Sequence, residues 1–199
     1  AACACAFPSV DAAVDTVVAL LQCAVPLARI ELLDDLTVGA VNAFSGVGLP
    51  AAPMIFLELH TFSTAAIAEQ LDLVREIVAD QGGTVHATAT TEEDRARLWE
   101  ARHKVYFAGL AMYPGARSWT TDVCVPISHL AECVRDARAD CARLNVLAPL
   151  VGHVGDGNFH MLLLVDAGDD DAMRRAREVN DRLVARAIAC GGTCTGEHG

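Results

Sequence analysis

The stretch from Gly152 to His160, GHVGDGNFH, carries two histidines whose spacing suits metal binding. Apolar runs flank Asp156 and Gly157, a pair typical of a tight two-residue hairpin turn. With that turn His153 stands directly opposite His160, and directly opposed residues have Cβ atoms about 4.5 to 5.5 Å apart. Both imidazoles could then bind one metal ion and leave positions open for a third ligand and a substrate. From spacing alone, a polar cross-strand pair beside a turn explains the histidines equally well.

The segment GGTCTGEHG offers a carboxylate and a further histidine. Glu197 and His198 are adjacent, and in an extended segment adjacent side chains point in opposite directions. Glu197 joined to the two histidines of GHVGDGNFH would complete a two-histidine, one-carboxylate metal site. His198, whose ordinary pKa lies near neutrality, would then be a natural general base. Taken by themselves, the two residues are also explained as part of a polar loop.

Two arginines could bind an anionic substrate. Leu98, Arg102 and Tyr106 are spaced four residues apart in a predicted helix, so they share one face. Apolar neighbours predict that this face is partly covered, and an arginine there should have an anionic partner. That partner is either a substrate carboxylate or a structural one, unless the side chain snorkels to water. Arg117 follows in the loop YPGAR, where it could reach the same place or be solvated.

The elements that must position these residues alternate between strands and helices. Polar caps mark the predicted helix starts at Ser9, Ser63 or Thr64, Thr91 and Ser128. The strands predicted near the candidate residues are 119–125, 146–154 and 159–165. The sequence Gly-Gly-Thr follows a predicted helix at 82–84 and again at 191–193. This recurrence could be a faint duplication of a ferredoxin-like unit.

Composition limits the class of protein. The chain has 199 residues, 53% of them hydrophobic, which is enough for one domain with a sizeable core. A net charge of −11 argues against nucleic acid as a partner, because phosphates require a basic surface. No apolar run reaches the roughly 18 residues of a transmembrane segment. Eight cysteines without a CxxC pair predict reduced packing thiols, and hence an intracellular or organellar compartment.

Several segments resemble, in order and separation, FAD-dependent D-lactate dehydrogenases of the cytochrome-linked type. They are RIELLDD, the RH at Arg102, TDVCVPIS, GHVGDGNFH and GGTCTGEHG, and the similarity covers essentially the whole chain. It implies the C-terminal, substrate-binding half of a flavoenzyme of the vanillyl-alcohol-oxidase class. The implied fold is α+β, a largely antiparallel sheet with ferredoxin-like elements covered by helices. Residues 1–199 would be the FAD-linked oxidase C-terminal domain, truncated at its C-terminus and without the N-terminal FAD-binding domain.

The resemblance implies a role for each candidate residue. His153, His160 and Glu197 match the ligands of a divalent metal, zinc or manganese, that binds the substrate's hydroxyl and carboxylate. Arg102 matches the arginine that binds the carboxylate. His198 matches the base that takes the hydroxyl proton while a hydride passes to the flavin. FAD itself would be bound mainly by the absent domain, so we expect no catalysis by this piece alone.

Two further positions bear on the substrate. Arg117 falls where relatives commonly carry a lysine that also holds the carboxylate, so a forked planar group replaces a point charge. The 2-hydroxyglutarate branch usually places an asparagine two residues after the second histidine, where this chain has Leu162. By strand alternation Leu162 shares the face of His160, and a leucine cannot bind a second carboxylate. The resemblance therefore predicts oxidation of D-lactate, or a similar short or apolar D-2-hydroxy acid, to the 2-oxo acid.

Other functions and the electron acceptor stay open at this point. Relatives pass electrons to cytochrome c or a quinone, usually in mitochondria or, in bacteria, in the cytoplasm or at the membrane. A glycolate oxidase subunit and a D-2-hydroxyglutarate dehydrogenase are alternatives within the superfamily. From a different class, the same three ligands with a polarised water could make a metallohydrolase. Cys194 or His198 as a fourth ligand would make the metal site structural.

Overall fold

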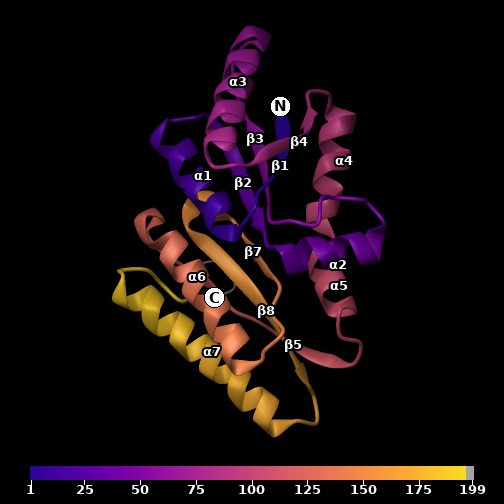
Figure 1. Cartoon of the computed structure of the whole chain (residues 1–199), viewed down its shortest axis with the longest axis vertical. Coiled ribbons are helices and arrows are strands. Elements are labelled where there is room, and N and C mark those ends of the chain that lie inside the picture. Colours follow the sequence, from indigo (N-terminus) through magenta and orange to yellow (C-terminus); the bar gives the residue numbers. More distant parts are fainter. Residues whose placement is uncertain (196–199) are drawn as a thin grey trace.

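The computed structural model describes residues 1–195, which form an antiparallel sheet between two layers of helices (Figure 1). The strands are β1 (Ala2–Ala6), β2 (Leu27–Leu33), β3 (Met54–Leu59), β4 (Thr84–Ala89), β5 (Ala116–Thr120), β6 (Val123–Cys124), β7 (Leu150–Gly152) and β8 (Asn158–Asp166). Their order is β4-β1-β3-β2-β7-β8-β5, and β6 pairs with β8 beside this path. The pairs are antiparallel, which confirms the predicted α+β fold class.

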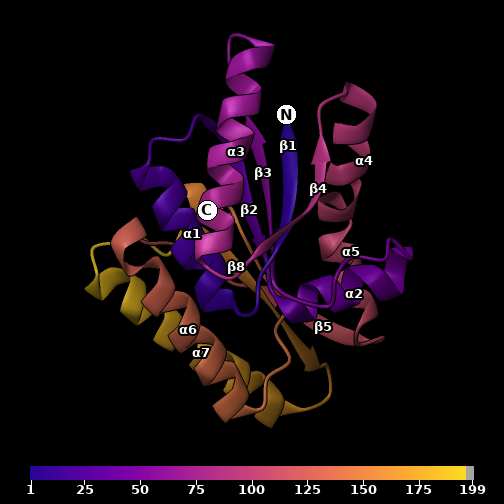
Figure 2. The same ribbon diagram turned by 45° about the horizontal axis from the view of Figure 1, so that its top comes forward.

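The helices are α1 (Val10–Gln22), α2 (Asp35–Ser45), α3 (Thr64–Asp80), α4 (Glu92–His103), α5 (Val105–Ala111), α6 (Ile127–Leu144) and α7 (Asp170–Ala189). Helices α1, α3, α6 and α7 cover one face of the sheet, and α2, α4 and α5 cover the other (Figure 2). Each face has its own hydrophobic core. Strand β3 contributes Ile55 and Leu57 to the first core and Met54 and Phe56 to the second. Burial on both faces explains why this strand is an almost continuous apolar run.

Side-chain caps begin most helices where the sequence predicts them. The hydroxyl of Ser9 accepts a hydrogen bond from the Ala12 amide, and Ser63 and Thr91 cap α3 and α4 in the same way. The predicted cap at Ser128 is wrong. Helix α6 begins at Ile127 after Pro126, which holds an extended conformation at the cap position, so Ser128 lies inside the first turn.

The fold contains two copies of a ferredoxin-like unit. Elements β1, α1, β2, β3, α3 and β4 have the strand order β4-β1-β3-β2, which is the ferredoxin-like arrangement. The same succession recurs in β6, α6, β7, β8 and α7, after which Thr193 bridges Cys124 as β4 pairs with β1. Gly192 permits this approach, because a Cβ there would lie 2.3 Å from the Cys124 carbonyl oxygen. The duplication suggested by the repeated Gly-Gly-Thr sequence is therefore present in the fold.

Two strands near the candidate residues differ from the sequence prediction. The predicted strand 119–125 divides into β5 and β6, both of which pair with β8. Between them the Thr121 amide donates to the Met161 carbonyl oxygen at 3.0 Å, and the Thr121 hydroxyl accepts a hydrogen bond from the Met161 amide at 2.9 Å. A side-chain oxygen thus stands where a regular ladder would have a main-chain acceptor. The predicted strand 146–154 shortens to Leu150–Gly152, preceded by an isolated bridge from Leu147 to Leu164.

Within residues 1–195, no helix combines the length and the apolar character that crossing a membrane requires. The cysteines in this part of the chain are free thiols, in agreement with the prediction from their spacing. Burial raises the pKa of the Cys141 thiol to about 12, so it stays protonated at neutral pH and packs as a small apolar group.

Candidate functional site

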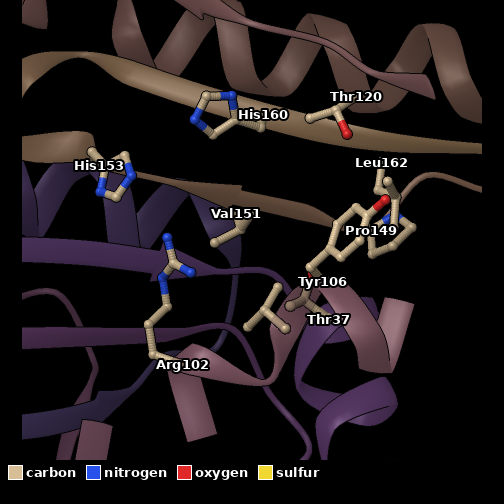
Figure 3. Close-up of a pocket in the computed structure, with 10 residues that line it drawn as sticks. Thr37, Arg102, Tyr106, Thr120, Pro149, Val151, His153, His160 and Leu162 are labelled. Atoms are coloured by element: carbon tan, nitrogen blue, oxygen red, sulfur yellow. The ribbon is translucent and has the colours of Figure 1, made fainter. Parts of the chain in front are cut away.

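A cavity of about 300 Å³ lies between the hairpin β7–β8 and the helices α4 and α5 (Figure 3). Its polar lining consists of Thr37, Arg102, Tyr106, Thr120, His153 and His160. Its apolar lining consists of Val105, Pro149, Val151 and Leu162. Arg102, His153 and His160 project from three different segments toward the same space, whereas Leu162 and Pro149 lie at the other end (Figure 3). The cavity thus has a cationic and imidazole end and an apolar end.

The predicted β-hairpin forms, but its register differs from the predicted one. Val151 pairs with His160, so the connection is longer than two residues and contains the 3-10 turn η1 (Val154–Asp156). Gly157 ends this turn in a left-handed conformation with φ of 78°. A side chain there would clash with the Val125 carbonyl oxygen, which lies 1.9 Å from an added Cβ. Tertiary packing against Val125 therefore sets the loop, and the directly opposed pair predicted for His153 and His160 is wrong.

The two imidazoles nevertheless come together. Their ring centroids are 6.0 Å apart, and the ring planes are inclined by 81°. The His153 side chain is 38% exposed, whereas that of His160 is 6% exposed. His153 reaches the cavity from the loop and His160 from β8. The conformation of the loop, and not direct pairing between strands, therefore brings the two rings together.

Each imidazole has an acceptor beside its Nδ1 atom. Nδ1 of His153 lies 2.6 Å from Oε1 of Glu31 on β2. Nδ1 of His160 lies 3.1 Å from the carbonyl oxygen of Thr121 and 3.5 Å from Oδ1 of Asp122. Contacts of this kind orient histidines that bind metals through Nε2, because they fix the ring and its tautomer.

Arg102 also contacts Glu31. Its Nε atom donates to Oε2 of Glu31 at 3.1 Å, and its Nη2 atom lies 3.0 Å from the same oxygen in an ion pair. The anionic partner expected for Arg102 is therefore present inside the protein. The predicted helix breaks at Lys104, where α4 ends and α5 begins. Arg102 and Tyr106 still line one cavity, whereas Leu98 packs at the edge of the second core.

The remaining candidates lie in different places. Leu162 lines the cavity on the same face of β8 as His160, as strand alternation predicts. Arg117 is exposed on β5 and does not line the cavity. It stands an odd number of residues from Thr120, so it points to the other face of the sheet, and the structure does not bring it to Arg102. Glu197 and His198 lie outside the described residues.

Sequence reasoning missed the acceptors of the two histidines. Glu31 and Asp122 stand within RIELLDD and TDVCVPIS, but alternation alone does not show which strand a carboxylate will face. Within residues 1–195, no group of three or more histidines, cysteines and carboxylates is arranged to hold a metal ion. The described part of the predicted metal site is therefore the pair His153 and His160.

Cys124 holds the loop of the hairpin and the segment before Glu197 in place. Its thiol donates to the Asp156 carbonyl oxygen at 3.1 Å, and its backbone exchanges hydrogen bonds with Thr193 at 2.8 and 3.0 Å. Burial and the charges of Asp156 and Asp122 raise the pKa of this thiol, so it stays protonated and can donate. The segment after α7 is thus attached two residues from Asp122, beside the candidate site.

Comparison with known proteins places the chain in a family. Residues 1–199 match the family described as FAD linked oxidases, C-terminal domain. A probable mitochondrial D-lactate dehydrogenase of Danio rerio is 47% identical over 98% of this chain and 39% of that protein. A mitochondrial D-lactate dehydrogenase (cytochrome) of Arabidopsis thaliana is 35% identical over 98% of this chain and 34% of that protein. The structure of 4-ethylphenol oxidase from Gulosibacter chungangensis matches 96% of this chain and 44% of that one, with a TM-score of 0.70 and 16% identity.

The chain spans 39% and 34% of the lengths of these two relatives, so it corresponds to one part of them. The match to the oxidase structure, at 16% identity, supports the fold alone. The resemblance drawn from the separate sequence segments is confirmed by the match over residues 1–199. The chain belongs to the family of FAD-linked oxidases, in which it corresponds to the C-terminal domain.

Proposed function

We propose that this chain is the substrate-binding half of a flavin-dependent dehydrogenase that oxidises D-lactate, or a similar short or apolar D-2-hydroxy acid, to the 2-oxo acid. The observation that carries the proposal is the cavity, in which a guanidinium and two imidazoles face apolar side chains. This lining suits a small molecule with one carboxylate, one hydroxyl and a short apolar tail. The names of the Danio rerio and Arabidopsis thaliana relatives support D-lactate as the substrate and mitochondria as the location.

The proposed metal ligands are His153, His160 and Glu197, and the proposed ion is zinc or manganese. The two histidines suit such an ion, because an acceptor beside each Nδ1 makes Nε2 the ligating nitrogen. Bonds of about 2.0–2.1 Å from zinc to nitrogen place two ligating rings with centroids roughly 5 to 6 Å apart. The observed separation is 6.0 Å. When bound, the ion would polarise the substrate hydroxyl and help to hold the carboxylate.

The position of Thr193 supports Glu197 as the third ligand. Thr193 pairs with Cys124, and Asp122, two residues before Cys124, contacts His160. Glu197 follows Thr193 by four residues, a length of chain that reaches at most about 14 Å. This length of chain and the attachment beside Asp122 support the proposal that Glu197 joins the two histidines as a ligand.

Three further candidate residues have separate tasks in this proposal. Arg102 binds and orients the substrate carboxylate, and Leu162 contacts the apolar tail and excludes water. His198 takes the hydroxyl proton. FAD, which membership of the family implies, accepts the hydride when bound, and no residue of this chain is assigned to flavin binding. The proposed electron acceptor is cytochrome c or a quinone, and the name of the Arabidopsis thaliana relative supports a cytochrome.

A spectrum of the full-length protein tests the proposed function. We expect a yellow protein whose flavin absorbance is bleached by D-lactate in the absence of oxygen. Bleaching by glycolate or D-2-hydroxyglutarate in preference to D-lactate would move the function to another branch of the family. A colourless protein that hydrolyses esters or amides would overturn the assignment in favour of a metallohydrolase.

Leu162 leads to a prediction about substrate choice. The full-length enzyme should use D-lactate and D-2-hydroxybutyrate with a kcat/KM about tenfold or more above that for D-2-hydroxyglutarate, whose second carboxylate would be buried without a partner. Leu162→Asn should lower the ratio of kcat/KM for D-lactate to kcat/KM for D-2-hydroxyglutarate. Leu162→Met keeps an apolar side chain in the cavity and should leave this ratio unchanged. Steady-state kinetics with the three acids measure the effect. A native preference for D-2-hydroxyglutarate would contradict the assignment.

The metal site leads to a second prediction. His153→Ala and His160→Ala should each remove most of the bound metal from the full-length protein and lower turnover in parallel, while flavin stays bound. His129→Ala is the matched control, because His129 is a partly exposed histidine on α6, outside the cavity lining. Elemental analysis and flavin absorbance on the same samples give both contents. Normal metal content in both cavity variants would exclude these histidines as ligands.

A further inference from the structure

We infer that Glu31 is a positioning residue that holds Arg102 and His153 in fixed relation to each other, an inference that rests on the proposed function of those two residues. Glu31 is buried, with 6% of its surface exposed. Its Oε1 atom lies 2.6 Å from Nδ1 of His153. Its Oε2 atom accepts a hydrogen bond from Nε of Arg102 at 3.1 Å and lies 3.0 Å from Nη2 of the same guanidinium. One carboxylate therefore bridges the proposed carboxylate-binding residue and a proposed metal ligand.

The position of Glu31 in the sheet explains why it can make both contacts. Strand β2 lies between β3 and β7, and its pairing with β7 includes Leu32 opposite Gly152. Glu31 is one residue beyond this pair, where the chain leaves β7 at His153. Arg102 comes from the last turn of α4 on the face that also carries α2 and α5. The bridge thus joins a loop and a helix whose positions would otherwise be set separately.

The contacts with Glu31 leave Arg102 able to bind a substrate carboxylate and His153 able to bind a metal ion. Arginine has five N–H donors in a planar fork, and the bonds to Glu31 use the Nε edge, so the outer end of the fork can still bind a carboxylate. A carboxylate beside Nδ1 of His153 favours the tautomer with its proton on Nδ1, which makes Nε2 the metal-binding atom. Glu31 therefore orients the Arg102 guanidinium and the His153 imidazole toward the cavity, and this role does not require contact between Glu31 and the substrate.

His160 does not depend on Glu31. Its Nδ1 atom has the main-chain carbonyl of Thr121 at 3.1 Å and Asp122 at 3.5 Å. A main-chain carbonyl is held by the fold, whereas a side-chain carboxylate can be removed by one substitution. A change at Glu31 should therefore loosen one of the two proposed histidine ligands and leave the other oriented.

Strand β3 provides a matched control in Glu58. Glu58 is 8% exposed and is paired with Arg29 at 2.7 Å and Arg95 at 2.9 Å. It is thus a buried carboxylate with two cationic partners, like Glu31, but it does not line the cavity. Glu58→Gln removes the same charge from the same sheet as Glu31→Gln does. Both variants should have a lower free energy of unfolding, but only Glu31→Gln should bind Zn²⁺ more weakly.

The test measures Zn²⁺ affinity by chelator competition, and KM and kcat for D-lactate, in the full-length flavoprotein. Glu31→Gln should weaken Zn²⁺ binding by about 10- to 100-fold, the usual effect of removing a residue that orients a metal ligand, and should raise KM. Glu58→Gln should leave Zn²⁺ affinity unchanged. Glu31→Asp keeps the charge and is too short to bridge both partners, so it should also bind Zn²⁺ more weakly and serves if Glu31→Gln fails to fold.

Native Zn²⁺ affinity in the folded Glu31 variants would overturn the inference, as would an equal loss of affinity in Glu58→Gln. His153→Ala, measured in the same series, separates this inference from the proposed function. If His153→Ala loses Zn²⁺ while Glu31→Gln keeps it, the role of Glu31 alone is wrong. If His153→Ala binds Zn²⁺ as the native protein does, the proposed metal site fails, and the inference fails with it.

Discussion

Replacing Arg102 with alanine in the full-length protein is expected to lower kcat/KM for D-lactate at least a hundredfold. The chain carries a net charge of −11, so a small anion must be held by a local cation, and Arg102 supplies one inside the cavity. Losing one partner of a buried, hydrogen-bonded charge pair costs about 2 to 5 kcal/mol, and each 1.4 kcal/mol is about tenfold. Steady-state kinetics over a range of D-lactate concentrations measure the loss.

The Arg102→Ala variant also leaves Glu31 without its arginine partner, so its melting temperature should fall. Arg102→Lys separates the two effects. A lysine can keep an ion pair with Glu31 and preserve stability, but its ammonium cannot bind Glu31 and a substrate carboxylate through parallel forked bonds. Arg102→Lys should therefore melt near the native temperature and still have a reduced kcat/KM.

Arg117→Ala is the control for a general loss of positive charge. Arg117 is exposed on β5 and does not line the cavity, so its removal should change kcat/KM much less than the removal of Arg102. Equal effects of the two alanine variants would mean that the overall positive charge of the domain, rather than the guanidinium in the cavity, holds the substrate. They would also restore the role in carboxylate binding that the resemblance implied for Arg117.

Replacing His198 with alanine is expected to slow the reduction of flavin by D-lactate by about two to four powers of ten, the usual contribution of a general base. The variant should retain its flavin and its metal, because the proposed task of His198 is proton transfer and not ligation. Rapid-mixing absorbance spectroscopy without oxygen gives the reduction rate constant directly, without any contribution from the electron acceptor.

His103→Ala is the matched control for the loss of a histidine, since His103 is exposed at the end of α4 and does not line the cavity. It should reduce its flavin at the native rate. Near-native reduction in His198→Ala would assign the proton transfer to another group. Loss of metal in His198→Ala would instead make His198 a ligand, as in the alternative of a structural metal site.

Features that depend only on neighbours along the chain could be predicted from the order of amino acids. The caps at Ser9, Ser63 and Thr91 need a hydroxyl three residues before an amide, and this is a local condition. The alternation that places Leu162 on the face of His160 follows from the two-residue repeat of a strand. The family resemblance also rests on strings of neighbouring residues, so the order of amino acids is enough to reveal it.

Which groups distant in sequence come into contact depends on the packing of the whole chain. Glu31 is 71 residues from Arg102 and 122 residues from His153 in sequence, and no local pattern indicates that one carboxylate serves both. The hairpin register depends on Val125, because its carbonyl oxygen lies so close to residue 157 that only a glycine fits there. Alternation gives the side chain of a strand residue a face, but strand order and helix packing decide what that face meets. For this reason the amino-acid order indicates Arg102, His153 and His160 as candidates, and only the folded chain brings them to one cavity, with Glu31 in contact with Arg102 and His153.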